Sequence, residues 1–356
     1  MTSTRQHRWV AALVLVAVAA VGCSRGGGDS TSEDAIARPD DPTSAGERPV
    51  QFVGAGKVRL FGTFTMPETK AGETVPGVLV LPTAGPGSTT AAGRTGVADP
   101  LGRDLADTFG NAGLATYRYD QRGTGESRIE PDVRLTLDDL VADARAALDL
   151  LAQRRETAGR DLSVVGYDQG GLVALRLAAV DDRVKRVVLI STPGRSLADV
   201  RAAQLTDRYG PESPAALRTL VADLIATRAL PPIEAMRTEL RGLFPPQEAA
   251  FLAELYGLDP AVEAAKVKAR AMIVVPADPA PYDPQRLAAV MPGAQVLASA
   301  GSGATLVISG ETPEDLSDPV SPAHEHGMGA PVAATKRDAA ALDRVAQFLT
   351  VSPSQP

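Results

Sequence analysis

The chain has 356 residues, 44% hydrophobic and 22% charged, which is enough to bury one large core. Its 36 basic and 43 acidic residues give a net charge of -7, and no basic stripe interleaved with aromatic residues occurs. Nucleic acid is therefore not expected as a partner. The single cysteine, Cys23, excludes a disulfide within the chain and a cysteine-ligated metal site.

The first 23 residues form a pattern of their own. Arg5 and Arg8 precede an apolar run, 10–21, which is too short to span a bilayer, and the run leads into Ala-Val-Gly-Cys at 20–23. This arrangement resembles the signal peptide and lipobox of bacterial lipoproteins. The resemblance implies that Cys23 is acylated, becomes the mature N-terminus and anchors the protein to the outer face of the cell membrane. The alternative is a plain secretory signal with an incidental cysteine.

The next segment, 24–49, is rich in Gly, Ser, Asp and Pro and has almost no residue to bury. Such a composition predicts a disordered tether. We expect one folded domain, 50–356.

The first part of this domain predicts strands and helices in alternation. Residues 58–66 alternate in polarity, and 78–81 form an unbroken apolar run typical of a buried parallel strand. A helical pattern over 101–112 is followed by a short strand at 114–117 and by an amphipathic helix at 137–151.

The central stretch begins with an apolar run at 162–165 and continues through Gly-Tyr-Asp-Gln-Gly-Gly at 166–171 into a helix-like pattern of leucines and alanines. It predicts a strand, a tight turn and a helix. Gly-x-Ser-x-Gly in this context resembles the nucleophile elbow of the α/β-hydrolases, in which small residues allow a strained turn with an exposed central side chain. Here Asp168 stands in place of the serine.

The remaining elements complete the alternation. A strand is expected at 183–190, helices over 196–266 with proline-rich breaks, strands at 271–275 and 294–298, and a final helix at 332–349. Strands that alternate with helices predict a mostly parallel sheet covered on both faces.

A second motif strengthens the family resemblance. The run Tyr-Asp-Gln-Arg-Gly-Thr-Gly-Glu-Ser at 119–127 is similar to the turn that packs beside the elbow in α/β-hydrolases, and we interpret Asp120 and Arg122 as fixing that loop. The resemblance implies an α/β-hydrolase fold with eight strands and a helical lid at 196–266. It also implies an oxyanion hole formed by backbone N–H groups near Ala84 and at Gln169.

The resemblance allows each position of a catalytic triad to be checked in chain order. Asp168 occupies the nucleophile position. Asp278 lies near the position of the acid, with Asp283 a further candidate. No histidine occurs in 299–306, where the family places its base, so that His324 and His326 remain, either as a displaced base or as part of a solvated turn. These residues provide too few clustered ligands for a metal, and no cofactor is expected.

Two functions follow from these substitutions. In the first, a carboxylate at 168 accepts the oxyanion-hole donors itself, and the protein is a catalytically lapsed hydrolase with a binding role in the cell envelope. In the second, Asp168 is a nucleophile that forms an ester intermediate on an ester, epoxide or haloalkane. Three altered positions favour the first. The expected partners are a small molecule under the lid and the membrane, through the lipid anchor.

Overall fold

The computed structural model describes residues 46–70, 72–82, 99–130, 135–275, 282–291, 293–298 and 339–351. The chain separates into two units, 1–34 and 35–356, and all of these residues belong to the second. The predicted leader and nearly all of the predicted tether lie outside the described residues. Among the helices described, none has the length and apolarity needed to cross a membrane.

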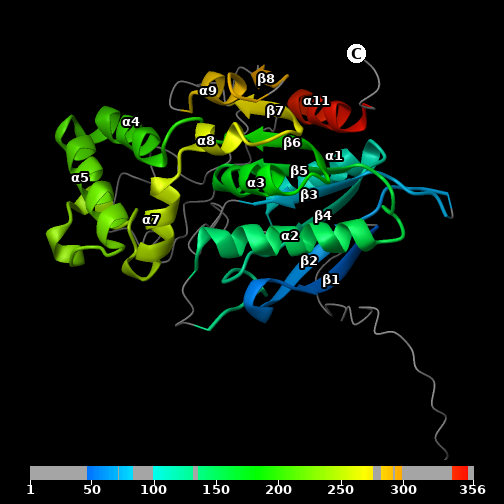
Figure 1. Ribbon diagram of the computed structural model, residues 1–356, viewed down its shortest axis with the longest axis horizontal. Coiled ribbons are helices and arrows are strands. Elements are labelled where there is room, and N and C mark those ends of the chain that lie inside the picture. Colours follow the sequence, from blue (N-terminus) through cyan, green and yellow to red (C-terminus); the bar gives the residue numbers. More distant parts are fainter. Residues whose placement is uncertain are drawn as a thin grey trace, which may run out of the picture. The chain divides into compact units, whose positions relative to one another are not determined.

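The domain is built on one eight-stranded sheet (Figure 1) with the strand order β1-β2-β4-β3-β5-β6-β7-β8. The β2–β4 pair and the β1–β2 pair are antiparallel, and the other neighbours are parallel. The predicted mostly parallel sheet is therefore confirmed. The strands are β1 (Glu47–Val53), β2 (Arg59–Thr65), β3 (Gly77–Leu81), β4 (Ala115–Tyr119), β5 (Leu162–Tyr167), β6 (Val184–Ile190), β7 (Arg270–Val275) and β8 (Gln295–Ala298).

The central strands are buried along almost their whole length, as their unbroken apolar sequences predict. The first strand was not predicted, because it begins with the polar run Glu47-Arg48-Pro49 at the end of the proposed tether. It forms because all seven of its residues pair with β2. The side chain of Glu47 is also neutralised by an ion pair with the buried Arg118 of β4.

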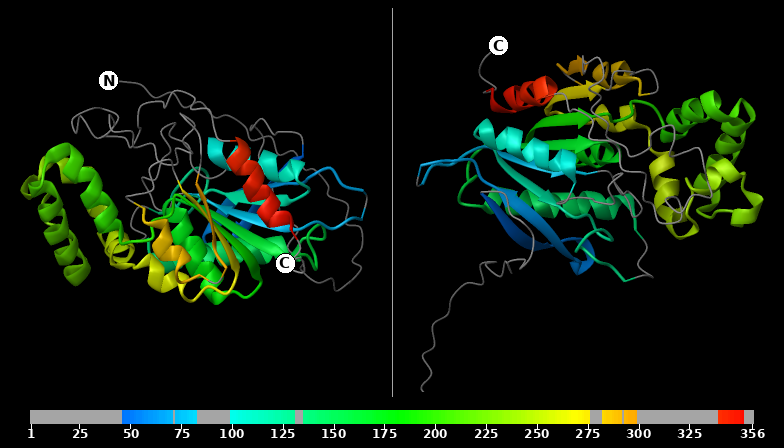
Figure 2. Two further views of the ribbon diagram at one scale, coloured as in Figure 1. Left: turned by 90° about the horizontal axis from the view of Figure 1, so that it is seen from above. Right: turned by 180° about the vertical axis from the view of Figure 1, so that it is seen from behind.

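Helices cover both faces of the sheet, as expected. On one face, α1 (Pro100–Asn111) and α11 (Ala339–Thr350) lie side by side over a core that includes Val80 and Val165 (Figure 2). On the other face, α2 (Leu137–Gln153) and α3 (Gln169–Val180) bury a larger core, together with α9 (Pro284–Ala288). The part of the final helix predicted at 332–338 lies outside the described residues.

Two helix starts carry strong capping signals. The carboxylate of Asp99 accepts the N–H of Gly102 at the start of α1, where Pro100 is the first helical residue. Thr136 and Asp139 form a capping box at the start of α2. Because these helices precede β4 and β5, the caps lie at the edge of the sheet where the parallel strands end.

The segment between β6 and β7 is helical. It contains α4 (Leu197–Tyr209), α5 (Glu212–Thr227), η3 (Ile233–Ala235), α6 (Thr238–Arg241), η4 (Pro246–Glu248), α7 (Ala249–Gly257) and α8 (Pro260–Ala264). Phe244 stacks on Tyr256 with the ring centroids 5.2 Å apart. The carboxylate of Glu254 on α7 accepts the N–H of Leu137, the first residue of α2, at 2.8 Å. This bond ties the helical segment to the carboxyl edge of the sheet.

Candidate functional site

Asp168 lies between β5 and α3, with φ 50° and ψ -123°. A positive φ is uncommon for a residue with a side chain and costs on the order of 1–3 kcal/mol unless the surroundings enforce it. Its N–H donates to the carbonyl of Ile190 at 2.8 Å, and its carbonyl accepts the N–H of Gly171 at 3.1 Å. The predicted strand, tight turn and helix are confirmed, and the turn is strained at the residue that replaces serine.

Three glycines allow this turn to pack. A Cβ on Gly166 would lie 2.5 Å from the carbonyl oxygen of Gly170, and one on Gly170 would lie 2.0 Å from the carbonyl oxygen of Pro82. A Cβ on Gly171 would lie 1.8 Å from the hydroxyl of Thr192. The first contact closes the turn, the second places it against the end of β3, and the third places it against the segment after β6.

The side chain of Asp168 is half-buried and makes no capping hydrogen bond with the N-terminal turn of α3. An aspartate just before a helix ordinarily accepts a backbone N–H of that turn. The positive end of the α3 macrodipole still favours a negative charge at this position.

The residue before the elbow is anchored on the other side of the sheet. The hydroxyl of Tyr167 donates a short hydrogen bond to the carboxylate of Asp99, and each residue is only 2% exposed. Burial raises the pKa of the Tyr167 hydroxyl well above its ordinary value, and the nearby charge of Asp99 adds to this. Burial also raises the pKa of Asp99, against the opposing effect of the hydrogen bond from Tyr167.

The loop after β4 is held by a buried ion pair. The guanidinium of Arg122 donates to both oxygens of Asp143 on α2, each at 2.6 Å, and also to the carbonyl of Ala55 at 2.9 Å. Burial raises the pKa of Asp143, and the Arg122 guanidinium opposes this rise. Asp120 accepts the N–H of Glu126 at 3.0 Å. These contacts agree with the interpretation that Asp120 and Arg122 fix the loop.

A second strained residue lies next to the elbow. Ser191 follows β6 with φ 46° and is 5% exposed, and its N–H donates to the carbonyl of Val274 at 2.8 Å. Tyr167 pairs with Ile190 in the sheet, so Ser191 is the neighbour of Asp168 on the adjacent strand. Nothing in the sequence signals this strain, because serine is not a residue that favours a positive φ.

The predicted site residues are only partly described. Gln169 is the first residue of α3 and is half-buried, which is the position expected for an oxyanion-hole N–H. Asp283 is the residue before α9, has φ 48° and makes no capping bond with its side chain. Five residues named from the sequence lie outside the described residues: Cys23, Ala84, Asp278, His324 and His326.

Two other serines can be removed from consideration as nucleophiles. Ser127 is fully buried, and its hydroxyl accepts the N–H of Phe61 at 3.0 Å. Ser163 lies in the interior of β5 and is 2% exposed. Within the described part of the chain, no group of three or more His, Cys, Asp or Glu side chains could hold a metal ion.

The helical segment contributes one unusual carboxyl group. Burial raises the pKa of Glu248, the residue before α7, from its ordinary value of 4.5 to about 7. Its side chain makes no capping bond with α7. The sequence carries no signal for this group, because its desolvation depends on the packing of neighbouring helices.

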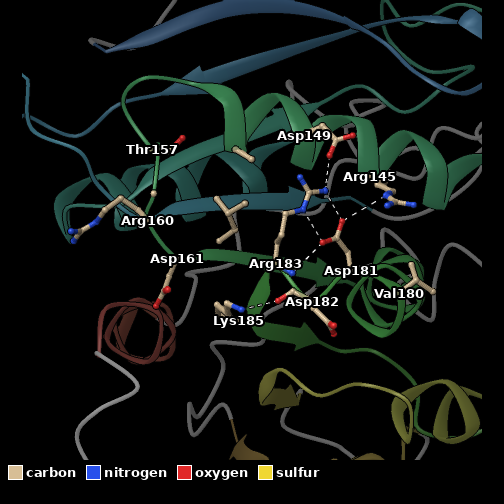
Figure 3. Close-up of a pocket in the computed structure, with 13 residues that line it drawn as sticks. Arg145, Asp149, Thr157, Arg160, Asp161, Val180, Asp181, Asp182, Arg183 and Lys185 are labelled. Carbon is tan, nitrogen blue, oxygen red and sulfur yellow. Dashed lines mark hydrogen bonds and ion pairs between the residues drawn. The ribbon is translucent and has the colours of Figure 1, made fainter.

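A surface hollow of about 830 Å³ lies at the opposite edge of the sheet, where β5 and β6 begin. Four basic and four acidic side chains line it. Figure 3 shows the guanidinium of Arg183 between the carboxylates of Asp149 and Asp181, with N–O distances of 2.5 and 2.6 Å. The hollow is therefore remote from the elbow. Its charges compensate one another, and none of its lining residues except Gly159 has a positive φ, so we do not assign the site there.

The fold and the elbow together define the class of the protein. A family model for the alpha/beta hydrolase fold matches residues 77–254, which include β3, the elbow and most of the helical segment. The chain belongs to the α/β-hydrolase family.

Among individual proteins, the uncharacterized protein PA2218 of Pseudomonas aeruginosa is 28% identical over 141 residues, which cover 40% of this chain and 35% of that protein. The crystal structure of PA2218 is similar with a TM-score of 0.54 at 17% identity, over 87% of this chain and 95% of that one. The structure of DcsB in complex with its substrate analogue has a TM-score of 0.53 at 17% identity, over 85% and 98% of the two chains. At these identities the structural likeness shows the fold alone.

Proposed function

We propose that this protein is an α/β-hydrolase-fold protein of the cell envelope that has lost acyl-transfer catalysis and binds a small molecule at the elbow. The observation that carries the proposal is the carboxylate of Asp168 at the apex of an otherwise intact, strained elbow. The helical segment between β6 and β7 is the proposed lid over the ligand, and acylated Cys23 is the proposed anchor.

The charge of Asp168 explains why this site binds rather than catalyses. In a serine enzyme the elbow residue is neutral, and backbone N–H groups stabilise negative charge only as the transition state forms. An aspartate brings that charge before any substrate arrives, next to the N-terminus of the 12-residue helix α3. The anion is then stabilised in the ground state, which weakens it as a nucleophile. It favours a ligand that presents a cationic or hydrogen-bond-donating group.

The rest of the chain supports the same proposal. No histidine occurs in 299–306, where a base for an elbow nucleophile is expected. The serines nearest to the family motifs, Ser127 and Ser163, are buried. A fluorophosphonate probe is accordingly expected to leave the folded protein unlabelled.

The strain at Asp168 favours a second candidate function, that of an active hydrolase. Backbone strain is retained mainly at functional sites. A carboxylate on a strained turn can attack a saturated carbon and form an alkyl ester, while that carbon's bond to a halide or to an epoxide oxygen breaks and the halide or alkoxide leaves with the electron pair. In this candidate an activated water then hydrolyses the ester, and an oxygen of that water enters the Asp168 carboxylate.

Turnover in ¹⁸O-water separates the two candidates. On ester, epoxide and haloalkane substrates, we expect no product from the wild type and no label in Asp168. If the carboxylate accepts the oxyanion-hole donors, as proposed, Asp168→Ala leaves those donors unpaired and should lower the free energy of unfolding by about 1–3 kcal/mol. Hydrolysis by the wild type that disappears in Asp168→Ala, with label in the carboxylate, would establish the active hydrolase instead.

The anchor is tested separately. Metabolic labelling with an acyl probe should mark the protein in the membrane fraction, and Cys23→Ala should move it to the soluble fraction, because each buried CH₂ of a lipid chain contributes about 0.8 kcal/mol to membrane binding. An unlabelled, soluble wild-type protein would contradict the lipoprotein assignment and leave the proposal for the elbow unaffected.

A further inference from the structure

Tyr167 and Asp99 connect the elbow to the far side of the sheet. Tyr167 is the last residue of β5, and its ring lies in the core beneath α1 and α11. Its hydroxyl donates to Asp99, the residue that caps α1. We propose that Tyr167 and Asp99 form a positioning pair that holds Asp168 in the orientation in which it meets its ligand. This inference rests on the proposed role of Asp168 as the binding group.

The geometry at the end of β5 gives Tyr167 this influence. Successive side chains of a strand point to opposite faces, so a residue next to the elbow can be held from below while the elbow side chain remains above. The peptide group between Tyr167 and Asp168 is fixed on one side by the hydrogen bond from Asp168 N–H to the Ile190 carbonyl. On the other side it is fixed by the buried ring and hydroxyl of Tyr167. A strained φ persists only when both sides are held.

Asp99 is a rigid partner for this purpose. The same carboxylate oxygen that accepts the Tyr167 hydroxyl also accepts the N–H of Gly102, at 3.0 Å. The residue is 2% exposed and is followed by Pro100, whose ring restricts the backbone at the start of α1. Tyr167 is therefore attached to the first turn of a helix rather than to a mobile side chain.

The elbow has a second, independent attachment at the end of β3. Gly170 packs directly against the carbonyl of Pro82, where a Cβ would lie only 2.0 Å away. The side-chain amide of Gln121, from the loop after β4, donates to the same carbonyl at 3.3 Å. The residues on both sides of Asp168 are thus fixed to neighbouring elements, Gly170 by backbone packing and Tyr167 by one hydroxyl. The hydroxyl is the attachment that a single substitution can remove without creating a clash.

The charges around the pair complete the arrangement. Arg118 lies on β4, in register with Val80 of β3, and its charge acts on both Asp99 and Tyr167. Arg118 in turn pairs with Glu47 and is influenced by Arg103. The charge of Asp168 reaches Tyr167 as well. Since the pair is proposed to set the orientation of Asp168, loss of the Tyr167 hydroxyl should change which groups the Asp168 carboxylate faces, and the titration of that carboxylate reports the change.

The test uses Tyr167→Phe, with Tyr119→Phe as the matched control. Tyr119 is the last residue of β4, which β3 separates from β5 in the sheet. It is 1% exposed and packs in the other core, so the control removes the same hydroxyl from an equally buried ring. The first measurement is hydrogen exchange of the Asp168 and Gly171 amides, which form the elbow. The second is the titration of the Asp168 side chain by ¹³C NMR, assigned with Asp168→Asn. Neither measurement needs a ligand.

In Tyr167→Phe we expect the two elbow amides to exchange about 10-fold faster relative to core amides, and the midpoint of Asp168 to move by about 0.5 pH unit or more. In Tyr119→Phe both quantities should match the wild type. Equal elbow exchange and equal Asp168 midpoints in the two variants would overturn the proposal.

Asp99→Ser tests the pair from its other side. Serine retains a good helix cap but is shorter, so it keeps the start of α1 and removes the acceptor of the Tyr167 hydroxyl. It should reproduce both changes seen in Tyr167→Phe, and wild-type values would again overturn the proposal. Should Tyr167→Phe fail to fold, Asp99→Ser decides alone. Hydrolytic activity in the wild type would refute the proposed function without altering these outcomes.

Discussion

The two edges of the sheet differ in the strain of their backbone and in the pairing of their charged residues. At the carboxyl edge, Asp168 and Ser191 hold positive φ angles on adjacent strands, and glycines bring backbone atoms into close contact. At the amino edge, the hollow around Arg183 has ordinary backbone and paired charges. The hollow has a volume of about 830 Å³, but the strained edge carries the candidate site.

The edges also differ in how strongly their ion pairs are desolvated. The Arg122–Asp143 pair beside the elbow has side chains that are 3% and 0% exposed, whereas those of the Arg183–Asp149 pair in the hollow are 40% and 45% exposed. A buried charge that loses its partner is costly, while an exposed pair is screened by water. The same type of contact thus has a structural role at one edge and a minor role at the other.

The largest expected effect is the difference in stability loss between variants of these two ion pairs. Asp143→Ala removes the closer of the two carboxylates that pair with the buried Arg122 guanidinium and leaves only Asp139, at 3.5 Å. It should lower the free energy of unfolding by about 3–5 kcal/mol. Asp149→Ala, on the same helix, should lower it by less than about 1 kcal/mol. Urea denaturation of both variants measures the difference. Equal losses would show that burial does not separate the two edges.

A half-buried carboxyl group in the helical segment, Glu248, shows what desolvation does to a charge. Because Glu248 has a pKa of about 7 when folded and 4.5 ordinarily, the folded state holds its proton more tightly. Protonation therefore stabilises the fold fully below pH 4.5, and this contribution is lost as the pH rises to about 7. The loss is at most about 3.5 kcal/mol, since each unit of pKa shift corresponds to about 1.4 kcal/mol.

Glu248→Gln should remove this dependence. Thermal unfolding between pH 4 and pH 8 is expected to give the variant a higher melting temperature than the wild type at pH 8, and a smaller difference at low pH, because a neutral amide has no charge to desolvate. Glu68→Gln, at an exposed position, is the control and should follow the wild type. A variant as sensitive to pH in this range as the wild type would contradict the assignment.

The smallest of the three effects concerns the backbone contacts. Gly170→Ala forces a methyl group against the Pro82 carbonyl and should destabilise the protein by about 1–3 kcal/mol. Gly110 lies near the C-terminal end of α1, and a Cβ there would have no atom within 4 Å. Gly110→Ala should therefore stabilise the protein by up to about 1 kcal/mol. Melting temperatures that shift in opposite directions would confirm that close packing is specific to the elbow. A neutral Gly170→Ala would mean that the turn has room to relax.

The sequence alone predicts the alternation of strands and helices, the elbow and the loop at 119–127. These features are local: unbroken apolar runs specify buried parallel strands, and the glycines at 166, 170 and 171 permit the close backbone contacts of a tight turn. It did not reveal β1, because Glu47 and Arg48 read as part of a polar tether. Pairing with β2 and the ion pair with Arg118 decide that strand.

The groups that support Asp168 can be identified only from the tertiary structure. Tyr167 and Asp99 are 68 positions apart in sequence, so their hydrogen bond could not be read from spacing. The strain at Ser191 arises from its place between β5 and β7, and the raised pKa of Glu248 arises from packing of the helices around it. Contacts between distant segments create desolvation and strain, and a single sequence carries no record of which segments meet.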